Sequence, residues 1–314
     1  MKHEKNLSRA VRKGARREDY VHTDLALESS TPAAEQTEER VEWEADLGGS
    51  LAGNPAGNPA VITRRREVSG ESSVTVACGR LTARGEAALE PLARLLAGEI
   101  RRMAEGLLRR PTGPDCKVLA VGLGNAHMTP DAIGPHTIRR LTATRHLLDY
   151  DEALFASLGC CELSALVPGV MGQTGVESGE LVKCAAGLVK PDLLVVVDAL
   201  AARSCDRLAS TIQLSDGGIS PGAGVGNHRM AITRETMGCP VLAVGVPTVV
   251  DSSTLVLDAL AKAGMGEDTL PDELLGVLEE GRSFVVSPRD CDQMVELTCR
   301  LLAMALNRVF GVAE

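Results

Sequence analysis

Residues Val118–Pro135 constrain the fold more than any other stretch, because they read VLAVGLGNAHMTPDAIGP. A short apolar run, Val118–Val121, ends at a glycine-containing turn where the backbone can adopt positive φ. A helical pattern begins at Asp131, with Thr129 as the expected N-cap and Pro130 at the first helical position. In open α/β sheets, ligands bind just beyond the carboxyl ends of such strands. The stretch therefore predicts an α/β fold with Asp131 at a binding edge. The simpler interpretations are a phosphate-binding turn or a plain charge at a helix N-terminus.

A second acidic residue follows a second apolar run. Residues 193–197 read LLVVV, which is typical of a strand covered on both faces, and Asp198 comes directly after them. Two carboxylates at neighbouring strand ends can share a proton, and their mutual repulsion drives their pKa values apart. One carboxyl then serves as general base and the other as general acid when water attacks a peptide bond. Asp131 and Asp198 are therefore the candidate catalytic pair, with the two roles unassigned.

Five blocks of sequence follow one another within Val118–Leu255: VGLGN..MTPDAIGP, VPGVMGQTGVESGE, KPDLLVVVDALAARS, TIQLSDGGISPGAGVGNHR and PVLAVGVPTVVDSSTL. In their order and spacing these blocks resemble the germination protease family of endospore-forming bacteria. The stretch Thr23–Glu28 is similar to that family's propeptide cleavage site. The final FVVSPRDCDQMVELTCRLLAMALN is similar to its last strand and helix. One position departs from the pattern, because members of the family often have Lys where His228 stands.

The resemblance implies an endopeptidase that initiates the degradation of small acid-soluble spore proteins during spore germination. It implies synthesis as a zymogen that processes itself, with the cut expected between Asp24 and Leu25. It also implies a homotetramer in the forespore or spore core, with Asp131 and Asp198 as the residues that activate water. The family is related in fold to the hydrogenase-maturation peptidases, which bind a metal at a comparable site.

Alternating strand and helix patterns predict a three-layer α/β/α sandwich with a mostly parallel sheet. The resemblance makes this architecture phosphorylase/hydrolase-like and similar to the hydrogenase-maturation peptidases. Three parts are expected: a propeptide at 1–24, an N-terminal extension at 25–114 and the α/β peptidase domain at 115–314. The extension comprises an acidic and Gly/Pro-rich linker, two short strands and one long helix. The expected strands cover residues 61–68, 73–78, 116–121, 163–167, 193–197, 211–215, 240–246 and 284–286. The expected helices cover residues 83–109, 131–146, 178–189, 252–263 and 288–310.

Composition narrows the classes of partner. The net charge of −9 and the scarcity of aromatic residues (two Tyr, three Phe, one Trp) argue against nucleic-acid binding. There is no apolar run of membrane-spanning length, and the basic N-terminus lacks the apolar segment of a signal peptide, so we predict a cytoplasmic protein with no membrane contact. The nine cysteines have no CxxC or zinc-ligand spacing, which predicts reduced thiols and neither a metal nor another cofactor.

Other polar residues carry weaker signals. His127 and His228 could bind a metal or form ordinary polar contacts, and Arg203 could steady Asp198 or close a separate salt bridge. Four further acids are interpreted first as structural or surface charges: Glu177, Glu180, Asp216 and Asp251. Two alternative functions stay open, a metal-dependent peptidase of the hydrogenase-maturation type and a phosphate- or nucleotide-binding protein. The second lacks both a P-loop lysine and the spacing of a dinucleotide-binding motif.

Overall fold

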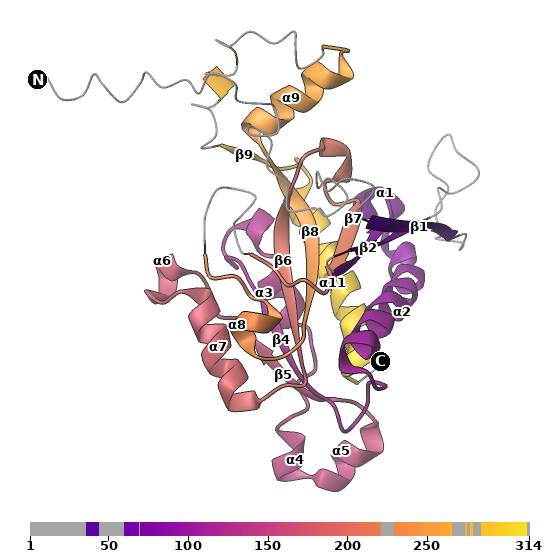
Figure 1. The fold of residues 1–314 in the computed structure, drawn as a ribbon, viewed down its shortest axis with the longest axis vertical. Coiled ribbons are helices and arrows are strands. Elements are labelled where there is room, and N and C mark those ends of the chain that lie inside the picture. Colours follow the sequence, from indigo (N-terminus) through magenta and orange to yellow (C-terminus); the bar gives the residue numbers. More distant parts are fainter. Residues whose placement is uncertain are drawn as a thin grey trace, which may run out of the picture.

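The computed structural model describes residues 36–43, 60–68, 70–220, 229–265, 274, 277–278 and 284–312. Within these residues, nine strands form one sheet in the order β1-β2-β3-β7-β8-β6-β4-β5, with β9 beside β8 (Figure 1). The strands are β1 (Gln36–Trp43), β2 (Ala60–Glu67), β3 (Ser72–Ala77), β4 (Lys117–Gly122), β5 (Glu162–Leu166), β6 (Leu193–Ala202), β7 (Thr211–Ser215), β8 (Val241–Asp251) and β9 (Val285–Val286). The predicted processing site, Asp24 and Leu25, and also His228 lie outside the described residues.

The sheet is mixed. Strands β5, β4, β6 and β8 are parallel neighbours, whereas β7 runs antiparallel to β8. Strands β3, β2 and β1 continue the sheet with antiparallel pairing throughout. The α/β class is thus confirmed, but the expectation of a mostly parallel sheet is wrong. The short connection between β2 and β3 permits only antiparallel pairing, because a parallel pair needs a long crossover.

Helices lie on both faces of the sheet (Figure 1). The α-helices and 3₁₀ turns are α1 (Leu81–Arg84), η4 (Glu86–Ala88), α2 (Leu89–Leu108), η5 (Thr129–Asp131), α3 (Ile133–Ile138), α4 (Leu147–Tyr150), α5 (Glu152–Leu158), α6 (Met171–Thr174), α7 (Ser178–Val189), η6 (Cys205–Arg207), α8 (Arg234–Met237), α9 (Ser252–Lys262) and α11 (Cys291–Phe310). Helices α2, α3 and α11 pack on one face and α7 on the other. Residues 193, 195 and 197 of β6 face the first group, and residues 194 and 196 face α7. Burial on both faces explains the continuous apolar run of this strand.

The described part of the N-terminal extension belongs to the same sheet and core. Strand β3 pairs with β7, and α2 packs along α11. Residues 36–43, expected to be linker, form strand β1. This strand is rich in charge and therefore looks like a linker in composition, but Glu39 lies opposite Arg64 of β2 and forms an ion pair of 3.1 Å with it. Cross-strand pairs of this kind stabilise a charged edge strand. The division of the chain into three parts stays a prediction.

The segment after β4 is less helical than expected. It forms the single turn η5 and then α3, which ends at Ile138, and Thr129 provides no N-cap hydrogen bond. The cause is close packing at Gly134, where a Cβ atom would lie 2.3 Å from the Leu123 carbonyl oxygen and 2.4 Å from that of Val197. The backbone at Gly134 therefore packs directly against the end of the sheet. A regular helix starting at Asp131 would not permit this close contact. Among the described residues, no helix combines the length and apolar character needed to cross a membrane.

Candidate active site

The carboxyl ends of β4 and β6 adjoin one another. Gly122 pairs with Val197, and the Leu123 N–H donates a hydrogen bond of 2.9 Å to the Val197 carbonyl oxygen. Asp198 is the next residue of β6, pairs with Gly245 of β8 and is only 6% exposed. Its Oδ1 atom accepts a hydrogen bond of 2.9 Å from the Ala199 N–H. Because side chains alternate along a strand, Asp198 lies on the sheet face that α7 covers.

Asp131 is held over the turn that ends β4. Its Oδ2 atom accepts a hydrogen bond of 2.7 Å from the Asn125 N–H. Gly124 has a φ of +108°, and a Cβ atom there would lie 2.0 Å from the Asp131 carbonyl oxygen and 2.9 Å from Oδ1. Only glycine permits this approach. The turn η5, which ends at Asp131, contacts both β6 and β8. The structure therefore places the two predicted acids at the same edge of the sheet.

The environment of Asp131 favours its protonated form. Burial raises the pKa of the Asp131 carboxyl, whereas the Asn125 N–H and the positive charge of Arg229 act in the opposite direction, and the net shift is upward. No ion pair joins Asp131 to a cation within the described part of the chain. A carboxyl with a raised pKa can hold a proton and donate it during a reaction.

Helices α6 and α7 form a wall beside these acids. The Gln173 Nε2 atom of α6 donates a hydrogen bond of 3.0 Å to Asn125 Oδ1, so α6 is tied to the Asp131 turn. Glu177 precedes α7, and its Oε1 atom accepts a hydrogen bond of 3.3 Å from the Met230 N–H. Its Oε2 atom is buried without a partner. Of the two interpretations of Glu177, a structural or a surface charge, the structure supports the structural one, because the residue anchors the segment that begins at Arg229.

Comparison with known proteins identifies the family. A profile described as germination protease matches residues 71–263. The germination protease of Clostridium acetobutylicum is 34% identical over 91% of this chain and 94% of that protein. The chain belongs to the germination protease family. The germination protease of Bacillus subtilis is 32% identical over 91% of this chain and 92% of that protein. The alignment with the relative from Clostridium perfringens strain SM101 is 39% identical but covers 60% of this chain and 64% of that protein.

The matched region includes both acids at the strand edge and the wall beside them. Two of the other acids that the sequence analysis singled out have structural partners. Asp251 is 3% exposed and caps α9 by accepting a hydrogen bond of 2.8 Å from the Ser253 N–H. Asp216 accepts a hydrogen bond of 2.6 Å from the Ser72 N–H and so fixes the start of β3. Glu180 is exposed in the first turn of α7.

The side chains that could bind a metal do not form a metal centre within the described residues. No three His, Cys, Asp or Glu side chains gather into a possible metal site in the part of the chain that the structure describes. Asp131 and Asp198 therefore fall short of the three protein ligands typical of a catalytic zinc site. His127 is exposed in the Asp131 turn, and Arg203 follows β6.

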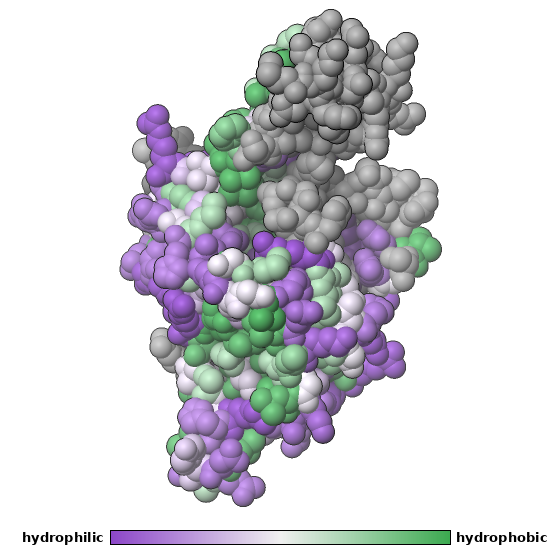
Figure 2. Space-filling model, turned by 90° about the vertical axis from the view of Figure 1, so that its left-hand side faces the viewer, coloured by the Kyte–Doolittle hydropathy of each residue, from purple (hydrophilic) through white to green (hydrophobic). Residues whose placement is uncertain are grey.

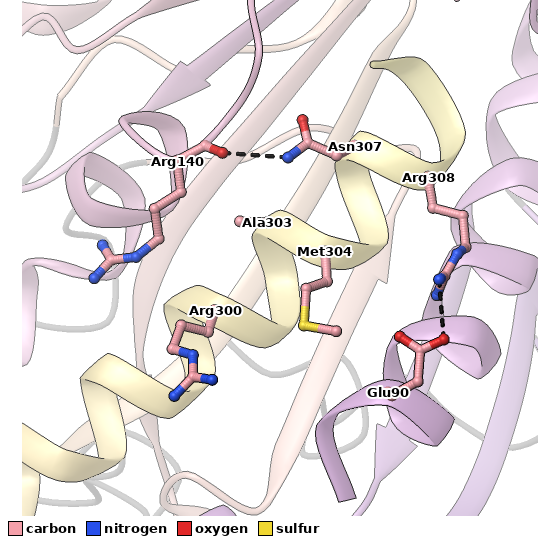
Figure 3. A pocket seen from close by; sticks show the side chains of 7 residues that line it. All are labelled: Glu90, Arg140, Arg300, Ala303, Met304, Asn307 and Arg308. Atoms are coloured by element: carbon pink, nitrogen blue, oxygen red, sulfur yellow. Dashed lines mark hydrogen bonds and ion pairs between the residues drawn. The ribbon is translucent and has the colours of Figure 1, made fainter. Parts of the chain in front are cut away.

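A pocket of about 480 Å³ lies away from the two acids, between α2, α11 and the end of α3 (Figure 3). Three arginines line it, and a carboxylate already pairs with each: Arg140 with Glu296, Arg300 with Glu86, and Arg308 with Glu90. The Asn307 Nδ2 atom donates to the Arg140 carbonyl oxygen at 3.2 Å. These ion pairs cancel most of the positive charge that an anionic ligand would need, so the pocket does not compete with the strand edge as the candidate active site.

Proposed function

We propose that the chain is an endopeptidase in which Asp131 and Asp198 activate water. One observation carries the proposal: two carboxyls of a germination protease family member lie at the adjoining ends of β4 and β6, with the pKa of Asp131 raised by burial. Asp131 holds the proton of the pair, and Asp198 is the base. This assignment follows from the raised pKa of Asp131, which favours the protonated form of that carboxyl.

The protons balance through both steps. Water attacks the peptide carbonyl carbon while Asp198 accepts a proton from it and Asp131 donates its proton to the carbonyl oxygen. A tetrahedral diol results. The C–N bond then breaks as Asp198 returns its proton to the leaving nitrogen. Asp131 recovers a proton from a diol hydroxyl, which becomes the carbonyl oxygen of the new carboxylic acid. The pair ends in its starting state.

We base the substrate, the assembly and the compartment on the family resemblance. We propose small acid-soluble spore proteins as substrates, a homotetramer as the assembly and the spore core as the compartment. Helices on both faces of the sheet support a hydrogenase-maturation-peptidase-like sandwich as the architecture. Incubation of the purified chain with a small acid-soluble spore protein should produce defined new termini, and Asp198→Asn should produce none. Asp149→Asn, which replaces an exposed acid on α4, is the matched control. Equal cleavage by Asp198→Asn would remove that residue from the mechanism.

We propose catalysis without a metal, because the described carboxylates lack a third ligand. Activity should therefore survive prolonged treatment with EDTA. Loss in EDTA, with recovery on addition of one divalent ion, would overturn this part of the proposal and direct attention to His127 and His228 as ligands.

We propose that the enzyme removes its own N-terminal arm. The segment 1–24 carries seven Lys or Arg against four Asp or Glu; it ends with the acid Asp24, and the apolar Leu25 follows it. A pair that shares one proton works when one carboxyl is protonated, so mild acid should favour the cut. N-terminal sequencing after incubation in mild acid should find Leu25 as the new terminus in the wild type and the original terminus in Asp131→Asn. The same cut in that variant would mean that another protease makes it.

A further inference from the structure

Two cysteines lie opposite each other where two parallel strands begin. Strands β4 and β5 pair from Lys117 and Glu162 onwards. The residues just before these, Cys116 and Cys161, therefore form the preceding pair. The Glu162 N–H supports this register, because it donates a hydrogen bond of 2.9 Å to the Cys116 carbonyl oxygen. Both cysteines are free thiols, 1% exposed, and belong to the core that α2 and α11 cover, so their side chains point to the same face of the sheet.

The spacing of the two strands suits a disulfide. Neighbouring strands lie about 4.8 Å apart, and the Cα atoms of a disulfide are about 4.4–6.8 Å apart. One residue further on, the side chains of Lys117 and Glu162 meet on the opposite face, with Nζ and Oε2 3.7 Å apart. On their own face the two thiols also meet, because Cys161 hydrogen-bonds to the Cys116 sulfur. Backbone register and side-chain direction therefore both permit an S–S bond between the strands.

The two thiols differ in reactivity. The hydrogen bond from Cys161 lowers the pKa of the Cys116 thiol and outweighs burial, which acts to raise it. Of the nearby charges, Asp192 acts upward on that pKa and Arg110 downward. Arg110 is held in place by an ion pair of 2.8 Å with Asp192, which also accepts the Lys117 N–H at 2.9 Å. The hydrogen bond to Cys116, together with burial, raises the pKa of Cys161. Cys116 is therefore the thiol that more readily becomes a thiolate, the nucleophilic form.

Two surface segments cover the thiols. The first is the connection 109–115 between α2 and β4, most of which is exposed. The carbonyl oxygen of Gly113 in this connection accepts the Cys116 N–H at 2.9 Å, and the Gly113 backbone also hydrogen-bonds to the Cys161 sulfur. The second is the last turn of α11, where the Phe310 carbonyl oxygen accepts the Cys161 N–H at 3.0 Å (Figure 1). Surface connections and helix ends open more easily than a core, so local opening admits a small solute to both thiols.

We infer that Cys116 and Cys161 are a peroxide-reactive pair that forms a reversible disulfide between β4 and β5. The Cys116 thiolate attacks one oxygen of hydrogen peroxide, and the O–O bond breaks. The hydroxide that leaves combines with the proton that Cys116 had released, which gives water and a sulfenic acid at Cys116. The Cys161 sulfur then attacks the Cys116 sulfur, so that the S–S bond forms as the S–O bond breaks. The departing hydroxide takes the Cys161 proton as a second water, and the two thiols have lost two electrons to one peroxide.

The disulfide would stabilise the fold and leave the candidate active site in place. It would close the segment between Cys116 and Cys161, which contains η5, α3, α4 and α5. A cross-link restricts the unfolded chain more than the folded one, so the oxidised protein should have a Tm about 5 °C higher than the reduced protein. The bond lies at the amino end of β4, whereas the Asp131 turn follows the carboxyl end. The inference is therefore independent of the proposed peptidase function.

The test treats the reduced full chain with an equimolar amount of hydrogen peroxide, blocks the remaining thiols and maps the peptides without reduction. The expected product joins the peptides of Cys116 and Cys161, is lighter than the two reduced peptides by two hydrogen atoms and separates in dithiothreitol. Cys184 is the internal control, because it is exposed on α7, on the side of the molecule that Figure 2 faces. Free thiols at both Cys116 and Cys161 after the treatment would overturn the inference, and so would a bond between Cys161 and the adjacent Cys160.

Serine variants separate the roles of the two thiols. Cys161→Ser keeps a hydroxyl that can donate to Cys116, so the Cys116 sulfenic acid should persist and react with dimedone. In Cys116→Ser, dimedone should not label Cys161. Cys160→Ser replaces the neighbouring buried thiol and, as the matched control, should keep both the disulfide and its rise in Tm. Dimedone labelling of Cys161 but not Cys116 would overturn the assignment of the attacking thiol. A disulfide that forms in the wild type without raising Tm would contradict its fit to the native register.

Discussion

Two buried acids of this protein have opposite electrostatic environments. Glu99 lies on α2 at 7% exposure and accepts hydrogen bonds of 2.6 Å from Arg64 and 2.6 Å from Arg102. Burial acts to raise the pKa of Glu99, but the hydrogen bonds from Arg64 and Arg102 outweigh it, and the pKa is lowered. Asp131 receives one backbone hydrogen bond, and the pKa of its carboxyl is raised. Burial therefore does not by itself set the direction of a pKa shift; the number of paired cations does.

The difference separates a structural acid from a candidate catalytic one. Glu99 is locked in its charged form and joins α2 to the sheet through Arg64 of β2. It contributes to the fold only as long as it stays ionised. Asp131 is underpaired, so its two protonation states lie closer in free energy, as a proton-transfer group requires. The following predictions test this contrast, from the largest expected effect to the smallest.

Activity should distinguish the two acids most strongly. Asp131→Asn should lower kcat at least about 100-fold, the scale of a lost general acid or base, because an amide cannot donate the proton. Glu99→Gln should keep kcat per folded molecule near the wild-type value. The measurement is turnover of a spore-protein substrate at matched concentrations of folded protein. Near-normal turnover by Asp131→Asn would place that residue outside the chemistry.

Two glycines, one beside each acid, offer the second contrast. Gly124→Ala would bring a Cβ atom to 2.0 Å from the Asp131 carbonyl oxygen at a φ of +108°. We expect a loss of about 2 kcal/mol or more in the free energy of unfolding, together with loss of activity. Gly98 is exposed on α2 next to Glu99, and a Cβ atom there would contact nothing within 4 Å. Gly98→Ala should therefore stabilise the protein by about 0.5–1 kcal/mol.

Urea unfolding of both glycine variants checks this prediction. Similar changes in the two variants would show that close packing at Gly124 does not fix the Asp131 turn.

Features that depend on local sequence were predicted well, whereas features that depend on contacts between distant residues were not. The sequence predicted α7 and β7 to the residue, because local periodicity and turn residues define their ends. It also indicated that Asp131 and Asp198 follow strands, and β4 and β6 are indeed neighbours. It missed β1, whose pairing with β2 depends on partners about 25 residues away. It also overextended the helix after Asp131, because packing of Gly134 against the sheet is tertiary.

The candidate site shows the same division. The sequence interprets Glu177 as a structural or surface charge, and only the Met230 N–H, 53 residues further on, shows which segment it anchors. Arg229 follows a glycine-rich stretch of sequence, and nothing in its local pattern places it near Asp131, which lies almost 100 residues earlier. The strand ends that carry the two acids can be predicted from local sequence. The position of α6 and α7 beside those acids depends on contacts between distant segments.

Removal of Glu99 should destabilise the fold. Glu99→Ala leaves Arg64 and Arg102 without their carboxylate, and we expect a loss of about 2 kcal/mol, the scale of hydrogen bonds to a charged group. Because the folded pKa of Glu99 is lowered, its contribution is present above the unfolded pKa and disappears as pH falls through the folded value. The difference from the wild type in urea unfolding should shrink below about pH 4. A difference that does not depend on pH would indicate lost packing instead of lost charge.

The smallest expected effect is the change in stability of Asp131→Asn, and its sign is opposite to that expected for Glu99→Ala. The folded pKa of Asp131 is raised, so its ionised form is disfavoured in the folded state, and its contribution to stability falls as pH rises through the folded value. Asp131→Asn removes that charge but keeps an oxygen that can accept the Asn125 N–H. Near neutral pH the variant should therefore be more stable than the wild type, with a rise in Tm of roughly 2 °C for a chain of this size. Below about pH 4 the Asp131 carboxyl would be protonated in both the folded and the unfolded protein, so the rise in Tm should vanish. Glu99→Gln should instead lower Tm near neutral pH. Thermal unfolding of the two variants across this range measures both signs in one experiment. A lower Tm for Asp131→Asn near neutral pH would mean that its carboxylate is paired in the folded state, as that of Glu99 is, and the contrast between the two acids would not hold.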